Sequence, residues 1–341
     1  MPKKLLHMLL TAFILLALIS CSRDGNEVNI YSGRHYQADE QLYHEFTKET
    51  GIRVNLIKAD TDQLINRLEL EGPNSPADLF ITADAGRMIH AMEKGLLQPM
   101  NMDKIAELVP STLRDPENHW TGFTKRARVI VYDKSRVNPE ELSTYEELTS
   151  ENWEGRILIR SSQNHYNQTL MASIVAAHGR EGALEWANGI VKNMAQPPRG
   201  NDRDQVKAIA AGIGDVAIVN TYYIGLLLNS PNVEEKNIAQ RMGIFFPNQK
   251  DRGTHINISG IGITANAPNA ENAQKLIEFL LSESSQSALA EQIFEYPANQ
   301  HVEWPDLLKE WGYFKVDTIP LDRLGNHLQQ GMIIFNQAGW D

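Results

Sequence analysis

Short β-prone segments alternate with amphipathic helical segments over the first hundred residues, and this alternation constrains the fold more than any other feature. The β-prone segments are residues 28–31, 52–57 and 78–82, and helical periodicity covers residues 39–50, about 61–70 and 85–94. Strand, helix, strand order at these spacings is typical of βαβ units. The sequence therefore predicts an α/β fold with a mainly parallel sheet.

A second set of elements begins after Gly122. Strands are predicted at residues 128–132, 153–159, 216–219, 242–247 and 256–264, helices at 168–177, 183–193, 204–211 and 272–281, a turn at 296–299, and a mixed tail to Asp341. We interpret residues 128–132 as a crossover into a second lobe and the segments that flank residues 248–253 as the return. Two α/β lobes joined by two crossovers form a cleft that can close around a small ligand. The expected lobes are residues 22–121 with 256–302, and 122–255 with 303–341.

The amino terminus predicts export. Lys3 and Lys4 precede an apolar run at residues 5–18, and residues 18–21 read Leu-Ile-Ser-Cys. This order is similar to a bacterial lipoprotein signal, which predicts cleavage before Cys21 and lipid attachment to it. The alternative is an ordinary signal peptide with a chance cysteine. Cys21 is the only cysteine, so the mature protein would have no thiol left, which suits an oxidising extracytoplasmic compartment.

Charge and motif content exclude several classes of function. The net charge is −11, which loss of Lys3 and Lys4 would lower to −13, and the chain has no long basic run, so a nucleic acid is not an expected partner. The usual catalytic signatures are absent. Residues 212–217 match the dinucleotide fingerprint by letter, but they follow a predicted helix and open a predicted strand, the reverse of what that motif requires.

Two adjacent tyrosines follow the strand predicted at residues 216–219. Residues 220–223 read Asn-Thr-Tyr-Tyr, and asparagine or threonine at a strand exit favours the start of a helix. Tyr222 and Tyr223 would then lie at a strand-to-helix junction. A phenolate is a hard oxygen ligand, and because the ordinary tyrosine pKa is about 10, a trivalent cation would be needed to deprotonate both. The alternative is that one ring packs in the core while the other lies on the surface.

Two further tyrosines occupy similar places. Tyr36 follows His35 and Tyr166 follows His165, each in a polar loop after a predicted strand, at the edge where open α/β sheets bind ligands. The arginines that accompany these loops are Arg34, Arg126, Arg128, Arg160, Arg199 and Arg203. Such cations would favour phenolates, although each one alone could belong to an ordinary surface ion pair.

Three stretches resemble a known family. Residues 32–36, 72–86 and 215–223 are similar to the ferric-iron-binding proteins of bacterial ABC importers, in the branch typified by FutA, whose site is built from tyrosines. The resemblance runs from about Val28 to the carboxyl tail. It implies the two-lobed type II periplasmic-binding-protein fold and no catalytic residue.

The resemblance also implies a site. Tyr36 from the first lobe and Tyr166, Tyr222 and Tyr223 from the second would bind Fe(III) as the transported ligand. His35 matches a histidine that binds the metal in some members. Arg126, and with it Arg34, would lie beside the ligands. Residues 224–226 are more apolar than in members with an extra polar group there, and Ser161 and Ser162 precede a helix that could bind an anion.

Charge balance agrees with this site. Four phenolates around Fe(III) leave one net negative charge, which one arginine could offset, and hard anionic oxygen favours the trivalent ion. Acid or reduction should loosen the metal, and ligands from both lobes would make binding close the cleft. The prediction is a monomeric lipoprotein, anchored in the periplasm or at the cell surface, that delivers ferric iron to an ABC permease.

Two rival functions remain open from the sequence. One is the same fold with another cargo: a different metal, an oxyanion or a small cationic organic molecule. The other is an enzyme with Fe(III)–tyrosinate chemistry, which would need an open coordination position and a base or nucleophile that the sequence does not show.

Overall fold

The first lobe opens with three strands and three helices in alternation. The computed structural model describes residues 25–341, so Cys21 and the predicted signal segment lie outside the described residues. Strand β1 (Glu27–Ser32) pairs in parallel with β2 (Arg53–Lys58) and β3 (Leu79–Thr82), and the helices that follow the strands are α2 (Gln37–Thr50), α3 (Thr61–Glu71) and α4 (Ala85–Glu93). This confirms the predicted βαβ order.

Local chemistry sets the ends of these helices. Gly51 ends α2 with φ 73°, a conformation that glycine adopts at little cost. The carboxylates of Asp60 and Asp84 accept hydrogen bonds from the first free backbone N–H groups of α3 and α4. The helices therefore start directly after the strands, which brings their first turns to one edge of the sheet.

The sheet as a whole is mixed, so the prediction of a mainly parallel sheet is wrong beyond the first three strands. Within the described residues, ten strands join in one sheet, with three parallel and six antiparallel pairings. The antiparallel pairings come mostly from β5 (Thr121–Asp133) and β9 (Ile256–Thr264). Because these strands run in opposite directions between the lobes, they cannot extend a parallel sheet.

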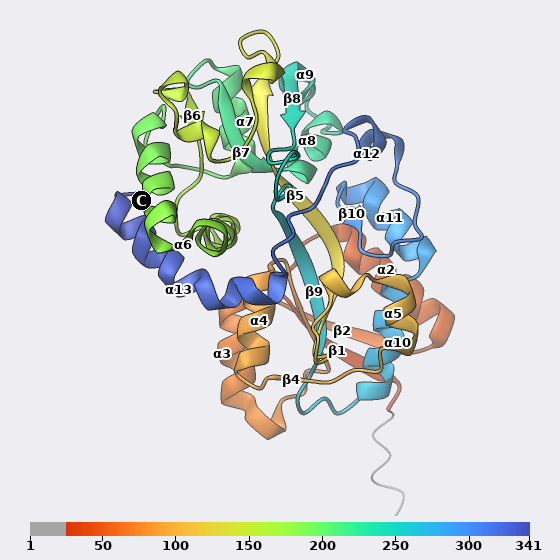
Figure 1. The fold of residues 1–341 in the computed structure, drawn as a ribbon. Coiled ribbons are helices and arrows are strands. Elements are labelled where there is room, and N and C mark those ends of the chain that lie inside the picture. Colours follow the sequence, from red (N-terminus) through yellow and green to blue (C-terminus); the bar gives the residue numbers. More distant parts are fainter. Residues whose placement is uncertain (1–24) are drawn as a thin grey trace, which may run out of the picture.

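The two long strands connect the lobes (Figure 1). The first half of β5 pairs with β9 and β10 (Tyr296–Pro297), and its second half pairs with β7 (Val216–Asn220) and β8 (Met242–Phe245). At the other end, β9 pairs with β3 and β4 (Leu97–Gln98). β9 is buried along its whole length. The predicted bounds of the two lobes stay a prediction.

The second lobe contains β6 (Ile157–Leu158), parallel to β7, and helices α6 (His165–Asn193), α7 (Asp202–Ala210), α8 (Thr221–Leu228) and α9 (Val233–Arg241). The strand predicted at 153–159 is therefore shorter. The helix predicted from residue 168 begins at His165, because the Asn164 side chain accepts the Tyr166 N–H at 3.2 Å. It continues through a break at Gly179 (φ 67°) into the helix predicted at 183–193.

The carboxyl-terminal part is more regular than predicted. It contains α10 (Ala270–Leu280), α11 (Glu283–Ile293), α12 (Asp306–Glu310) and α13 (Leu321–Ala338), and α5 (Asp103–Leu108) lies earlier. The turn predicted at 296–299 is partly strand β10. Helix α13 lies against both α6 and α4 (Figure 1). In the described part of the chain no helix has the length and apolar character needed to cross a membrane.

Candidate functional site

A cavity of about 410 Å³ lies where the first turns after the strands meet. Its lining includes Tyr36, which follows β1, Tyr166, which follows β6, and Tyr222 and Tyr223, which follow β7. Arg34 and His35 also line it, and His35 is exposed. The structure thus brings together six of the seven residues predicted for the metal and its surroundings; Arg126, which is buried, lies behind the lining.

Tyr222 contacts each of the other three tyrosine side chains. The hydroxyl oxygens of Tyr166 and Tyr222 lie 3.5 Å apart. The rings of Tyr222 and Tyr223 are stacked, with centroids 4.2 Å apart, and the ring of Tyr36 meets Tyr222 edge-on, with centroids 6.2 Å apart. Residues from both lobes therefore present phenol groups to one point.

Strand and helix ends produce this convergence. Asn220 ends β7 and Thr221 begins α8, so Tyr222 and Tyr223 occupy the first turn of the helix, as predicted. The side chain of Asn220 makes no capping hydrogen bond, contrary to expectation; it is fully buried, and neither amide atom has a partner within residues 25–341. Tyr166 likewise lies in the first turn of α6, and Tyr36 is the residue before α2.

Three of the four tyrosines, Tyr36, Tyr222 and Tyr223, have a raised pKa in this environment. Burial first, and then the charge of Glu295, raise the pKa of Tyr36 well above its ordinary value, and burial with the neighbouring phenols does the same to the pKa of Tyr222. Burial followed by the charge of Asp202 raises the pKa of Tyr223 to about 12. A ligand that binds these oxygens as phenolates must therefore carry a high positive charge.

Two buried arginines lie beside the phenol rings. The guanidinium carbon of Arg34 is 4.7 Å from the ring centroid of Tyr36, and that of Arg126 is 5.3 Å from the ring centroid of Tyr166. Both cations lower the pKa of Tyr36, in opposition to burial. Arg128, in contrast, binds Asp202 and Asn167, each at 2.7 Å, and supports the second lobe.

Glu295 is a site residue that the sequence analysis missed. Its carboxylate is fully buried and binds Arg34 at 3.1 Å and Arg126 at 3.4 Å. It also accepts a hydrogen bond from the Tyr36 hydroxyl at 3.0 Å. Burial alone would raise the pKa of Glu295, but Arg126 and Arg34 hold it below the ordinary value, so the residue is an anion behind the cavity.

The cavity can hold a metal chiefly through phenol oxygens. Within residues 25–341, no group of three or more histidine, cysteine, aspartate and glutamate side chains is arranged to hold a metal ion. Gln163 lines the cavity next to the start of α6, whereas Ser161 and Ser162, predicted as an anion site, are not part of the lining.

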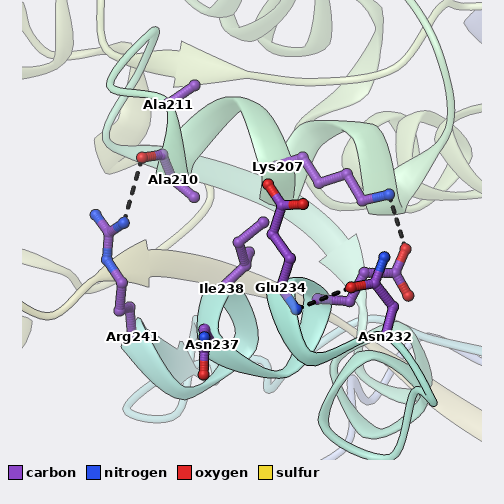
Figure 2. A pocket seen from close by; sticks show the side chains of 9 residues that line it. Lys207, Ala210, Ala211, Asn232, Glu234, Asn237, Ile238 and Arg241 are labelled. Carbon is purple, nitrogen blue, oxygen red and sulfur yellow. Dashed lines mark hydrogen bonds and ion pairs between the residues drawn. The ribbon is translucent and has the colours of Figure 1, made fainter.

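A second hollow, of about 480 Å³, lies between α7 and α9 (Figure 2). Lys207, Glu235 and Arg241 in its lining already have partners. Lys207 pairs with Glu235 at 2.8 Å, Arg241 donates to the Ala210 carbonyl at 3.4 Å, and the Asn232 side chain accepts from the Glu234 N–H at 2.8 Å. All of its lining comes from one lobe, and it contains none of the predicted site residues.

Comparison with known proteins gives consistent matches. The profile of a family described as bacterial extracellular solute-binding protein matches residues 74–317. Iron uptake protein A1 of Synechocystis is 50% identical over 317 residues, which cover 93% of this chain and 88% of that protein. The solved structure of Trichodesmium IdiA (FutA) in complex with iron and citrate ligands has 48% identity and a TM-score of 0.89, covering 92% of this chain and 100% of that one. The ferric binding protein from Campylobacter jejuni has 42% identity and a TM-score of 0.88, at 92% and 100% coverage.

Proposed function

The chain belongs to the bacterial extracellular solute-binding protein family, and we propose that its cargo is ferric iron, held by Tyr36, Tyr166, Tyr222 and Tyr223. It has the two-lobed periplasmic-binding-protein fold of its structural neighbours. As a solute-binding protein it is not an enzyme, and it delivers what it captures to an ABC importer.

The observation that carries the proposal is the convergence of four phenol groups from two lobes. The raised pKa values of Tyr36, Tyr222 and Tyr223 mean that a monovalent or weakly charged ligand would leave these three phenols protonated. Fe(III) has the charge and hardness to displace the protons, and Arg34 and Arg126 favour the phenolate form of Tyr36. His35, exposed at the rim of the cavity, completes the ligand set in this proposal.

The finer parts of the proposal concern place and assembly. We infer a periplasmic or cell-surface protein, anchored through a lipid on Cys21, that works as a monomer with an ABC permease. The predicted lobes, residues 22–121 with 256–302 and 122–255 with 303–341, would close on the metal as two bodies. The run of Lys3, Lys4 and the apolar segment before Cys21 supports export and anchoring.

Titration of the purified protein with Fe(III) citrate tests the proposed cargo. A visible phenolate-to-iron charge-transfer band should appear and saturate at one metal per chain. Tyr222→Phe and Tyr223→Phe should each weaken or abolish the band, because each removes a phenolate ligand. Tyr313→Phe is the matched control, since Tyr313 is 78% exposed. A wild-type protein without the band, or two site variants with the full band, would contradict the proposal.

A further inference from the structure

A second set of polar contacts crosses the cleft beside the tyrosines. Nη1 of Arg87, in α4 of the first lobe, donates a hydrogen bond to Oε1 of Gln168, in α6 of the second lobe, at 2.9 Å. Each partner is also held by its own lobe: Arg87 Nη2 lies 3.3 Å from Asp62, and Gln168 Nε2 donates to the Ser162 carbonyl at 3.2 Å. The two side chains are therefore oriented for each other, which lowers the entropy lost when they pair.

Asp84 makes a parallel connection at the amino-terminal end of α4. Its Oδ2 accepts hydrogen bonds from Thr169 Oγ1 in α6 at 3.2 Å and from Asn257 Nδ2 in β9 at 2.6 Å. Asn257 Nδ2 also lies 3.0 Å from Thr169 Oγ1. All three side chains are almost fully buried, so these bonds form in a protected environment where they are stronger than at the surface.

The same turn of α6 carries both the contact and a proposed ligand. Tyr166 lines the cavity, and Gln168 and Thr169 follow it in the helix. Because an α-helix moves as a rigid unit, the contact of Gln168 with α4 fixes the position of Tyr166 relative to the first lobe. Tyr36, which belongs to that lobe, is held 3.0 Å from Glu295.

Apolar packing continues the contact along α13, which lies over both α4 and α6 (Figure 1). A Cβ atom placed on Gly325 would lie 2.6 Å from Cγ2 of Ile89 in α4, and one on Gly331 would lie 2.9 Å from Cγ of Met171 in α6. Only glycine permits these approaches. Helix α4 thus packs against both α6 and α13.

We propose that Arg87 and Gln168 form a cleft latch: a pair of positioning residues that hold the two lobes together and so retain the metal, without binding it. This inference rests on the proposed function. Loss of the latch lowers the fraction of protein in the closed form, and the apparent affinity falls by that fraction. The iron ligands themselves stay unchanged, so the spectrum of the loaded protein is preserved.

Arg87→Ala tests the latch. Iron-loaded protein is mixed with excess EDTA, and release is followed by decay of the charge-transfer band. Release should be about tenfold faster than in the wild type, the effect of losing one charge-assisted hydrogen bond. The saturated band should keep its wavelength and intensity. Small-angle X-ray scattering should give a larger radius of gyration for the metal-free variant than for the metal-free wild type. Gln168→Ala, which removes the acceptor of the same hydrogen bond, should also speed release.

Arg53→Ala is the matched control, because Arg53 is an arginine of the same lobe whose side chain is 68% exposed. It should release iron at the wild-type rate. Release at the wild-type rate from both Arg87→Ala and Gln168→Ala overturns the latch. If the wild type gives no band with Fe(III), the proposed function fails, and the latch is then tested by scattering alone. A larger radius of gyration for Arg87→Ala than for the wild type supports the latch. An equal radius of gyration overturns it.

Discussion

The hydroxyl of Tyr36 donates a hydrogen bond to Oε1 of Glu295 at 3.0 Å, although 259 positions separate the two residues. Glu295 lies between two buried guanidinium groups, those of Arg34 and Arg126. One carboxylate therefore joins the proposed ligand of the first lobe to both cations of the site. The position of Tyr36 therefore depends on the buried cluster of Glu295, Arg34 and Arg126. No helix of the second lobe contributes a residue to this cluster.

Glu295→Gln should destabilise the protein strongly. The change keeps the shape of the side chain but removes the negative charge that both guanidinium groups share, and Asp39 then remains as a partner of Arg34 alone. We expect a loss of about 3–5 kcal/mol in the free energy of unfolding, as for other buried ion pairs that lose one member. Urea unfolding at pH 7 measures it. Glu303→Gln, at a side chain 83% exposed, should leave the free energy of unfolding almost unchanged. Equal effects of the two changes would contradict this account.

The sequence was sufficient to place the tyrosines at one site, because each follows a strand and the cavity lies where those strands end. Tyr36, Tyr166 and Tyr222 all lie within two residues of a helix start, although only α6 of these three helices has a side-chain cap. The proximity of these side chains could therefore be predicted without knowing any long-range contact.

Glu295 could not be found in this way, since it follows α11, an element the sequence analysis did not assign, and reaches the site only through tertiary packing. Helix α13 was missed for a different reason. Leu321, Leu324 and Leu328 have helical spacing, but Gly325 and Gly331 lower the helix propensity of the segment. The structure shows that these two glycines permit close packing on α4 and α6.

Arg160→Gln should weaken iron binding with little effect on the fold. Burial, followed by Asp202, raises the pKa of Tyr223 to about 12, and Arg160 opposes this shift. Loss of the cation should raise the pKa of Tyr223 further and so make the phenolate less favourable, which should lower the affinity for Fe(III) by up to about tenfold. Competition with citrate, read from the charge-transfer band, measures it. Arg156→Gln, a change of the same kind in an arginine paired with Asp215, should bind as the wild type does. Equal affinities in all three proteins would contradict the role of Arg160.

Cys21→Ser should release the protein from membranes. The proposed anchor is a lipid on the Cys21 thiol, and serine offers no thiol for that modification. After expression in a bacterial host and cell fractionation, the wild type should be found with membranes and the variant in the soluble extracytoplasmic fraction. Ser22→Ala, at the adjacent position, is the control and should stay with the membranes. An unchanged distribution of Cys21→Ser would show that the anchor is elsewhere.

Acid should destabilise the protein partly through His255, the residue before β9. Its ring is buried, Nε2 has no partner among the described residues, and burial, then Arg252 and Arg128, lower its pKa to about 3, with Asp84 opposing. The unfolded chain binds a proton near pH 6.5 that the folded protein takes up only near pH 3, so stability is complete above pH 6.5 and falls with pH below it. Between pH 6.5 and 5 the loss from this residue should be about 2 kcal/mol. Urea unfolding at pH 6.5 and pH 5 measures this loss in the free energy of unfolding. The loss should be smaller by that amount in His255→Gln than in the wild type. In His44→Gln, a change at an exposed histidine, it should equal that of the wild type. An equal loss of stability between pH 6.5 and pH 5 in His255→Gln and the wild type would rule out His255 as the group responsible.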